Sequence, residues 1–190
     1  MSQMLEQTYF QFPNWLGDVV MTLPGLYHYR LSHPDRHMIG CIKPAYAPVL
    51  KRWPIAMELW EYDKSQRKEL LRNLKSKGAG EVVLFTNSLG SFWPFLMSGC
   101  RPRLGLGERW TRLLLDIVPD NAVSSAQGDK ITQLLGGGAV PEPLALPSLI
   151  KPLKLAEQPP HLLIFPGAQY GPAKQWRVES YAGVADSAVC

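Results

Sequence analysis

Short β-rich runs alternate with longer amphipathic runs through the first 107 residues, and this alternation constrains the fold more than any other feature. Strands are expected at 8–12, 38–42, 56–60, 81–85 and 103–106. Helices are expected at 19–31, 45–52, 64–77 and 88–97, with weaker signals at 108–118 and 126–135. Pro24 and Pro94 are expected to kink or restart their helices, with Thr22 as a cap for the restart. Alternating strands and helices are typical of parallel βαβ units, so the predicted fold class is α/β.

A Gly/Pro-rich stretch at 136–160 interrupts this pattern and can form neither a long helix nor a central strand. After it we expect a buried strand at 161–165, a loop, and a helix from residue 175 onward. The domains are therefore predicted at 1–138 and 161–190, with a linker at 139–160. One strand and one helix cannot cover their own apolar faces, so the second domain is expected to be incomplete and prone to self-association.

The composition is that of an ordinary globular protein, with 46% hydrophobic residues and a formal charge of +4. It excludes a disordered chain, a collagen and a disulfide-stabilised miniprotein. Apolar runs stay far below the roughly 18 residues that cross a bilayer, and the N-terminus lacks the pattern of a secretory signal. The three scattered cysteines fit a reducing compartment, so the chain is expected to be cytoplasmic. Its net positive charge favours anionic ligands.

Residues 13–24, PNWLGDVVMTLP, follow the first predicted strand at the edge where parallel sheets bind ligands. Gly17 can adopt backbone angles closed to other residues, and Asp18 is expected at the start of a helix, whose positive end keeps a carboxylate ionised. Asp18 could therefore accept a proton. The alternative is that it only caps the helix. Trp15 could contact a ligand or simply pack beside the loop.

Residues 165–176, FPGAQYGPAKQW, combine a strand end, a glycine turn and a lysine before a helix. Backbone N–H groups at a helix start, with Lys174 beside them, suit a phosphate group. The spacing is neither that of a P-loop nor that of a dinucleotide fingerprint. Lys174 could equally be a solvated surface residue.

Lys64, Arg67 and Lys68 follow the third predicted strand and are expected at the same edge. Three positive charges there could hold anionic sugar or phosphate groups, or they could belong to a solvated helix face. Asn87 and Ser88, after the fourth strand, could hydrogen-bond hydroxyl groups of a ligand or cap the next helix.

Metal and nucleic-acid chemistry are not expected. The chain contains no DxD segment, and Pro34 separates His33 from His37, so they do not share a helical face. Its basic residues are not interleaved with stacking aromatics as in RNA-binding modules.

Three segments in order, PNWLGDVVMTLP, VVLFTNSLGSFWPFLMSG at 82–99 and FPGAQYGPAKQW, resemble the lipopolysaccharide heptosyltransferases of glycosyltransferase family 9, most closely their type II branch. The resemblance implies the GT-B architecture, in which two Rossmann-like domains face each other, the first holding the acceptor and the second the ADP-sugar. It also implies transfer of heptose from ADP-L-glycero-D-manno-heptose to the lipopolysaccharide inner core, with inversion and without an essential metal or other cofactor.

The resemblance assigns roles to individual residues. Asp18 matches the general base, and Lys174 matches the lysine that contacts the donor diphosphate, which Gly167 and Gly171 would allow the backbone to approach. The candidates for binding the anionic acceptor at the inner-membrane surface are Asn14, Trp15, Lys64, Arg67, Lys68, Asn87 and Ser88.

The family's second domain should continue with an Asp-Ser/Thr-Gly-x-x-His-type segment, which these 190 residues do not contain. A truncated chain with little or no transferase activity on its own is therefore expected. Two alternatives remain: a non-catalytic module that binds the acceptor, and an unrelated Rossmann-like protein that binds a nucleotide at Gly17 and Asp18. The first predicted strand is not followed by a GxGxxG segment, which counts against the nucleotide-binding alternative.

Overall fold

A computed structural model describes residues 7–53, 55–107, 109–119, 127–136 and 177–189. The chain divides into two units, Met1–Leu149 and Ile150–Cys190. The described part of the second unit is the helix α6 (Val178–Val189) with the residue before it. The expected linker at 139–160, the strand at 161–165 and the loop after it all lie outside the described residues, so these assignments stay predictions.

The first unit is built on a parallel sheet of five strands in the order β3-β2-β1-β4-β5. Phe10 of the central strand pairs with Gly40 on one side and with Val83 on the other. The strands are β1 (Gln7–Gln11), β2 (His37–Ile42), β3 (Glu58–Glu61), β4 (Glu81–Leu84) and β5 (Arg103–Gly105). The α/β class and its parallel sheet are therefore confirmed.

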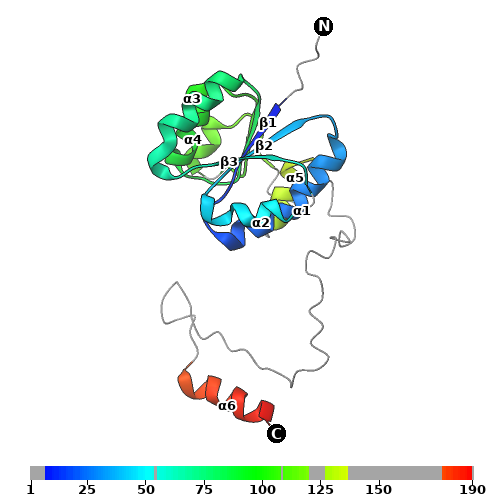
Figure 1. Ribbon diagram of the computed structural model, residues 1–190, viewed down its shortest axis with the longest axis vertical. Coiled ribbons are helices and arrows are strands. Elements are labelled where there is room, and N and C mark those ends of the chain that lie inside the picture. Colours follow the sequence, from blue (N-terminus) through cyan, green and yellow to red (C-terminus); the bar gives the residue numbers. More distant parts are fainter. Residues whose placement is uncertain (1–6, 54, 108, 120–126, 137–176, 190) are drawn as a thin grey trace. The chain divides into compact units, whose positions relative to one another are not determined.

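Helices cover both faces of this sheet (Figure 1). On one face lie α1 (Leu16–Ser32), α2 (Ala47–Lys51) and α5 (Gln127–Leu134), and on the other lie α3 (Arg67–Lys77) and α4 (Leu89–Ser98). Short 3₁₀ turns, η1 (Pro44–Tyr46) and η2 (Lys64–Gln66), precede α2 and α3. The surface helix expected at 108–118 is instead the 3₁₀ helix η3 (Arg109–Leu114).

The proline restart predicted for the first helix is wrong, because α1 runs unbroken through Pro24. Thr22 does not cap a new helix, since its hydroxyl donates to the Val19 carbonyl at 2.7 Å. A proline inside a helix removes one backbone hydrogen bond. Tertiary packing offsets that loss here, because Leu23 and Leu26 on the same helix are buried.

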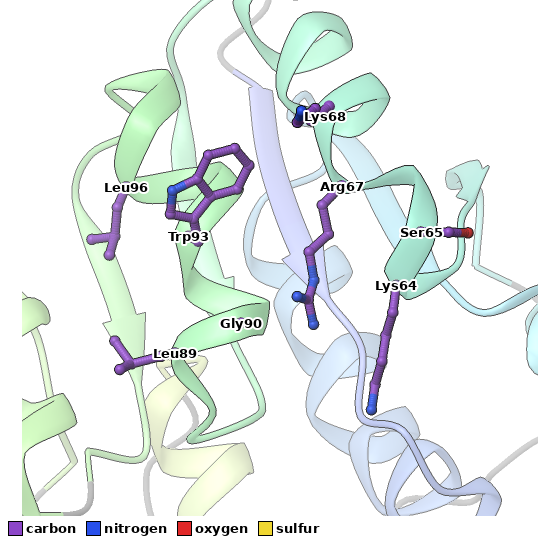
Figure 2. A pocket seen from close by; sticks show the side chains of 8 residues that line it. All are labelled: Lys64, Ser65, Arg67, Lys68, Leu89, Gly90, Trp93 and Leu96. Atoms are coloured by element: carbon purple, nitrogen blue, oxygen red, sulfur yellow. The ribbon is translucent and has the colours of Figure 1, made fainter.

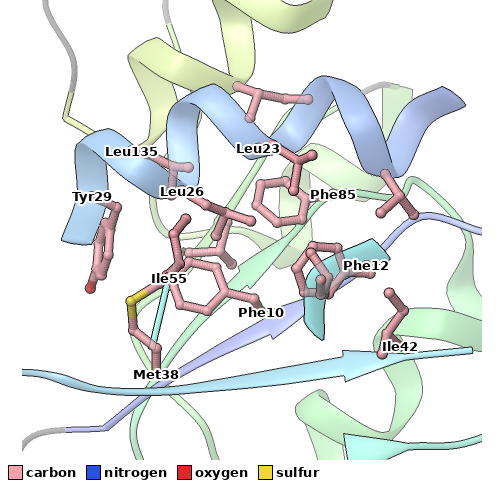
Figure 3. Packing of buried hydrophobic residues seen from close by; sticks show 14 of the residues in the cluster. Phe10, Phe12, Leu23, Leu26, Tyr29, Met38, Ile42, Ile55, Phe85 and Leu135 are labelled. Carbon is pink, nitrogen blue, oxygen red and sulfur yellow. The ribbon is translucent and has the colours of Figure 1, made fainter. Parts of the chain in front are cut away.

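The core has two halves, one on each side of the sheet. Alternate strand residues point to opposite faces, so Phe10 and Val83 join one half while Tyr9 and Val82 join the other. Figure 3 shows the first half, in which aromatic side chains of the sheet pack beneath α1. In the second half, α4 contributes buried phenylalanines and α3 contributes buried leucines.

The strand order places a topological switch point between β1 and β4. The chain leaves β1 into α1 on one face and leaves β4 into α4 on the other. The loops that follow these two strands therefore diverge at the carboxyl edge of the sheet, where open α/β folds bind ligands. Among the described residues, no helix combines the length and apolar character needed to cross a bilayer.

Candidate functional site

A cavity of about 680 Å³ lies between α3 and α4, near the carboxyl edge of the sheet (Figure 2). It forms there because η2 follows β3 and the start of α4 follows β4. The volume is typical of a small-molecule site. The lining residues are Lys64, Ser65, Arg67, Lys68, Leu89, Gly90, Trp93 and Leu96.

One wall of this cavity is cationic. A capping box at Asp63, whose N–H donates to the Gln66 side chain at 2.9 Å, sets the start of η2 and so the turn that carries the cations. Lys64 and Lys68 are exposed, and Arg67 is half-buried. Within the described residues, none of the three has a hydrogen-bond or ion-pair partner. The three positive charges that the sequence placed at this edge thus line one cavity, where they can attract an anionic ligand.

Gly90 permits a close approach between the two helices. A Cβ atom built on Gly90 would lie 2.7 Å from Nη2 of Arg67. The guanidinium group can rest against the first turn of α4 only because this position lacks a side chain.

A second, smaller hollow of about 20 Å³ adjoins the cavity, since Lys64 and Arg67 line both. Asn14 reaches it from the loop after β1, and Lys43 donates from its Nζ to the Asn14 carbonyl at 3.4 Å. Tyr62 is another lining residue, and burial raises its pKa to about 12, so its hydroxyl stays protonated well into the alkaline range. Sequence analysis missed Lys43 and Tyr62, although each comes directly after a strand that ends at this edge.

Asp18 lies in the first turn of α1, as its third residue. The capping interpretation is wrong, because the N-cap is Trp15 and no side chain caps the helix. Asp18 is partly exposed, and the described residues offer its carboxylate no hydrogen-bond or ion-pair partner. Asp18 lines neither the cavity nor the smaller hollow. The role of Asp18 as general base stays a prediction. Gly17 is an ordinary helical residue of α1, without the special backbone angles that we expected.

The remaining candidates at this edge have different surroundings. Ser88 is the N-cap of α4: its Oγ accepts from the Ser91 N–H at 3.3 Å and donates to the Ser91 hydroxyl at 2.8 Å. This confirms the capping interpretation of Ser88. Asn87 has a buried side-chain oxygen that finds no hydrogen-bond partner in the described part of the chain, and Trp15 is 45% exposed. Neither lines the cavity or the hollow.

Sequence analysis also missed the apolar wall of the cavity, which α4 provides through Leu89, Trp93 and Leu96. Their spacing places them on one side of a helix, a signal that usually indicates core packing. The described residues contain no group of three or more potential metal-binding side chains. The donor-side candidates Gly167, Gly171 and Lys174 lie outside the described residues.

The parallel five-stranded sheet with helices on both faces is the Rossmann-like fold of GT-B glycosyltransferase structures. No family model matches the chain. The chain is similar to lipopolysaccharide heptosyltransferase 2 of Escherichia coli K12. The two are 26% identical over an alignment 200 residues long, which covers 91% of this chain and 57% of that protein. It therefore spans little more than half the length of this relative. The match confirms the resemblance to the heptosyltransferases.

Solved structures support the same fold. The E. coli ADP-heptose lipopolysaccharide heptosyltransferase II aligns with a TM-score of 0.71 at 21% identity, covering 96% of this chain and 61% of that one. A family 9 glycosyltransferase from Veillonella parvula aligns with a TM-score of 0.60 at 20% identity, covering 72% of this chain and 42% of that one. The E. coli heptosyltransferase WaaC, solved with ADP, aligns with a TM-score of 0.60 at 14% identity, covering 72% of this chain and 49% of that one.

Proposed function

We propose that this chain provides the acceptor-binding side of a heptosyltransferase-type glycosyltransferase of lipopolysaccharide inner-core synthesis. The observation that carries the proposal is the sequence match to lipopolysaccharide heptosyltransferase 2, which extends over 91% of the chain. The cation-lined cavity at the ligand-binding edge of the sheet supports it. An anionic core saccharide anchored in a membrane would bring the protein to the cytoplasmic face of that membrane.

In the proposed reaction, an acceptor hydroxyl attacks the anomeric carbon of ADP-L-glycero-D-manno-heptose while Asp18 takes the hydroxyl proton. The bond from the anomeric carbon to the diphosphate oxygen breaks, ADP leaves, and the configuration inverts. Lys174, Gly167 and Gly171 would stabilise the charge on the departing diphosphate, so that no metal is needed.

Acceptor binding can be tested with the 190-residue chain itself. We expect saturable binding of a deacylated inner-core oligosaccharide by calorimetry, weakening as salt is raised. The Lys64→Ala change should reduce the affinity. Arg72→Ala, which removes an exposed positive charge outside the cavity, should leave it nearly unchanged. The absence of saccharide binding, together with stabilisation by NAD or ATP, would favour an unrelated nucleotide-binding protein.

Catalysis requires both halves of the site to hold the reacting groups, so we expect little or no heptose transfer by the 190-residue chain alone. A fusion to the donor-side half of the E. coli relative is needed to test Asp18. In that fusion Asp18→Ala should lower the transfer rate by roughly 10²-fold or more, as expected on losing a general base. Saccharide affinity should be retained. Undiminished transfer would exclude Asp18 as the base.

A further inference from the structure

We propose that Trp93 is a stacking platform for a sugar ring, so that the cavity between α3 and α4 selects an anionic saccharide over a simple anion or an acyl chain. The inference rests on the proposed function and adds to it a specificity-determining residue. The observation behind it is the contrast between the two walls of one cavity: cations on η2 and α3, and an aromatic, apolar surface on α4.

Trp93 exposes part of its indole at the cavity. It is 39% exposed although it lines a cavity, and Figure 2 shows its ring on the side of α4 that faces α3. Leu89 and Leu96 extend the same wall. The core beneath α4 is filled by other residues of the helix, Phe92 and Phe95, which are fully buried. The second half of the core therefore does not need Trp93 to be filled.

A sugar ring matches both walls at once. One face of the ring carries mainly C–H groups, whose partial positive charges are attracted to the electron-rich face of an indole. Carboxylate or phosphate substituents project from the rim of the ring and can reach Lys64, Arg67 or Lys68 across the cavity. Inorganic phosphate would engage only the cations, and an acyl chain would engage only the apolar wall.

The shape of the site distinguishes it from a membrane-docking surface. Helices that lie on a bilayer present a convex apolar face to the lipid. Trp93 and Leu96 instead line a recess of about 680 Å³, a volume typical of sites that enclose a small ligand.

The test uses the 190-residue chain, the Lys64→Ala variant and four tryptophan variants. Each is titrated separately with deacylated inner-core oligosaccharide, with inorganic phosphate and with vesicles of anionic phospholipid. Trp93→Ala should weaken saccharide binding about tenfold, while Trp93→Phe should keep most of the affinity. Trp93→Leu keeps the apolar volume but has no aromatic face, so it should also weaken binding. Phosphate affinity should not change. The control Trp110→Ala removes a tryptophan of similar exposure, 45%, which lies outside the cavity.

The outcomes separate this inference from the proposed function. If Lys64→Ala weakens saccharide binding but Trp93→Ala and Trp93→Leu do not, the platform is excluded while the proposed function stands. If the unaltered chain binds no core saccharide, the proposed function fails. A Trp93→Ala effect confined to vesicles of anionic phospholipid would assign Trp93 to membrane contact and overturn the inference. Circular dichroism of each variant verifies that the fold is retained.

Discussion

At the residue scale, the cavity depends on one missing side chain. Gly90 is the second residue of α4, and a Cβ atom there would meet the Arg67 guanidinium at 2.7 Å. Because the atom it would meet is the end of a flexible side chain, the arginine can move without disturbing either helix. Gly90 thus affects the position of a charge more than it affects stability.

The Gly90→Ala change should therefore separate binding from stability. Alanine is more favourable than glycine in a helix by up to about 1 kcal/mol, so the free energy of unfolding in urea should stay equal or rise. Affinity for the anionic saccharide should fall, because Arg67 is displaced. Gly128→Ala is the matched control: Gly128 is also the second residue of its helix, α5, and a Cβ there meets nothing within 4 Å. Equal affinities for both variants would contradict a role for the Arg67 position.

Ser88 gives the opposite expectation, since its hydroxyl is occupied by the cap of α4. Ser88→Ala should lower the free energy of unfolding by about 0.5–2 kcal/mol, the usual effect of losing an N-cap. Saccharide affinity should be nearly unchanged, and Ser88→Asp should recover most of the stability. A loss of affinity without a loss of stability would restore Ser88 as a ligand-binding residue.

At the element scale, β3 is an edge strand held to the rest of the unit partly by charge. Glu58 on this strand accepts a hydrogen bond from Trp60 Nε1 at 2.7 Å and pairs with Lys77 at 3.3 Å and His37 at 3.1 Å. The hydrogen bond from Trp60 holds the pKa of Glu58 below its ordinary 4.5, although partial burial acts in the opposite direction. The neighbouring Lys77 and His37 lower this pKa further.

This lowered pKa predicts a pH-dependent contribution to stability. The unfolded chain binds the proton more tightly than the folded one, so the contribution is present above about pH 4.5 and is lost as the pH falls through the folded-state pKa. Glu58→Gln should lower the free energy of unfolding by less than about 1 kcal/mol at pH 7, because Glu58 and its partner Lys77 form an exposed ion pair. The difference from the unaltered chain should shrink as the pH falls below about 4.5. The exposed Glu69 of α3 supplies the control variant Glu69→Gln, and a similar pH dependence in both would refute the assignment.

At the scale of the first unit, α5 completes the core although it is far from α1 in sequence. Ile131 of α5 and Leu135, the residue that directly follows α5, pack at Gly25, where a Cβ atom would lie only 2.9 Å from Leu135 Cδ1. The helices meet closely because α1 has a glycine at the contact. The first unit therefore needs residues beyond β5 to bury the outer side of α1.

Leu135→Ala should therefore lower the free energy of unfolding by about 2–5 kcal/mol, since Leu135 is only 2% exposed and its loss leaves a cavity. Leu113→Ala, at a position that is 87% exposed, should change it by less than about 0.5 kcal/mol. Urea denaturation of both variants measures the difference. Similar small effects would show that α5 is not part of the cooperative unit.

The sequence by itself determined the five parallel strands and most of the helices, because period-two and helical apolar patterns are local properties of the chain. It also placed Lys64, Arg67 and Lys68 at the ligand-binding edge, since residues that follow parallel strands collect there. It was wrong about a restart at Pro24, about the cap at Asp18 and about the backbone of Gly17. Those outcomes depend on packing against residues distant in sequence or on the residue at which a helix begins.

Only the tertiary structure decided which side chains share a cavity. Trp93 and Gly90 show no local signal that separates them from ordinary helix residues. They line a cavity only because α3 lies beside α4. Which face of a helix meets a neighbour depends on how both pack on the sheet, and that packing is a property of the whole unit.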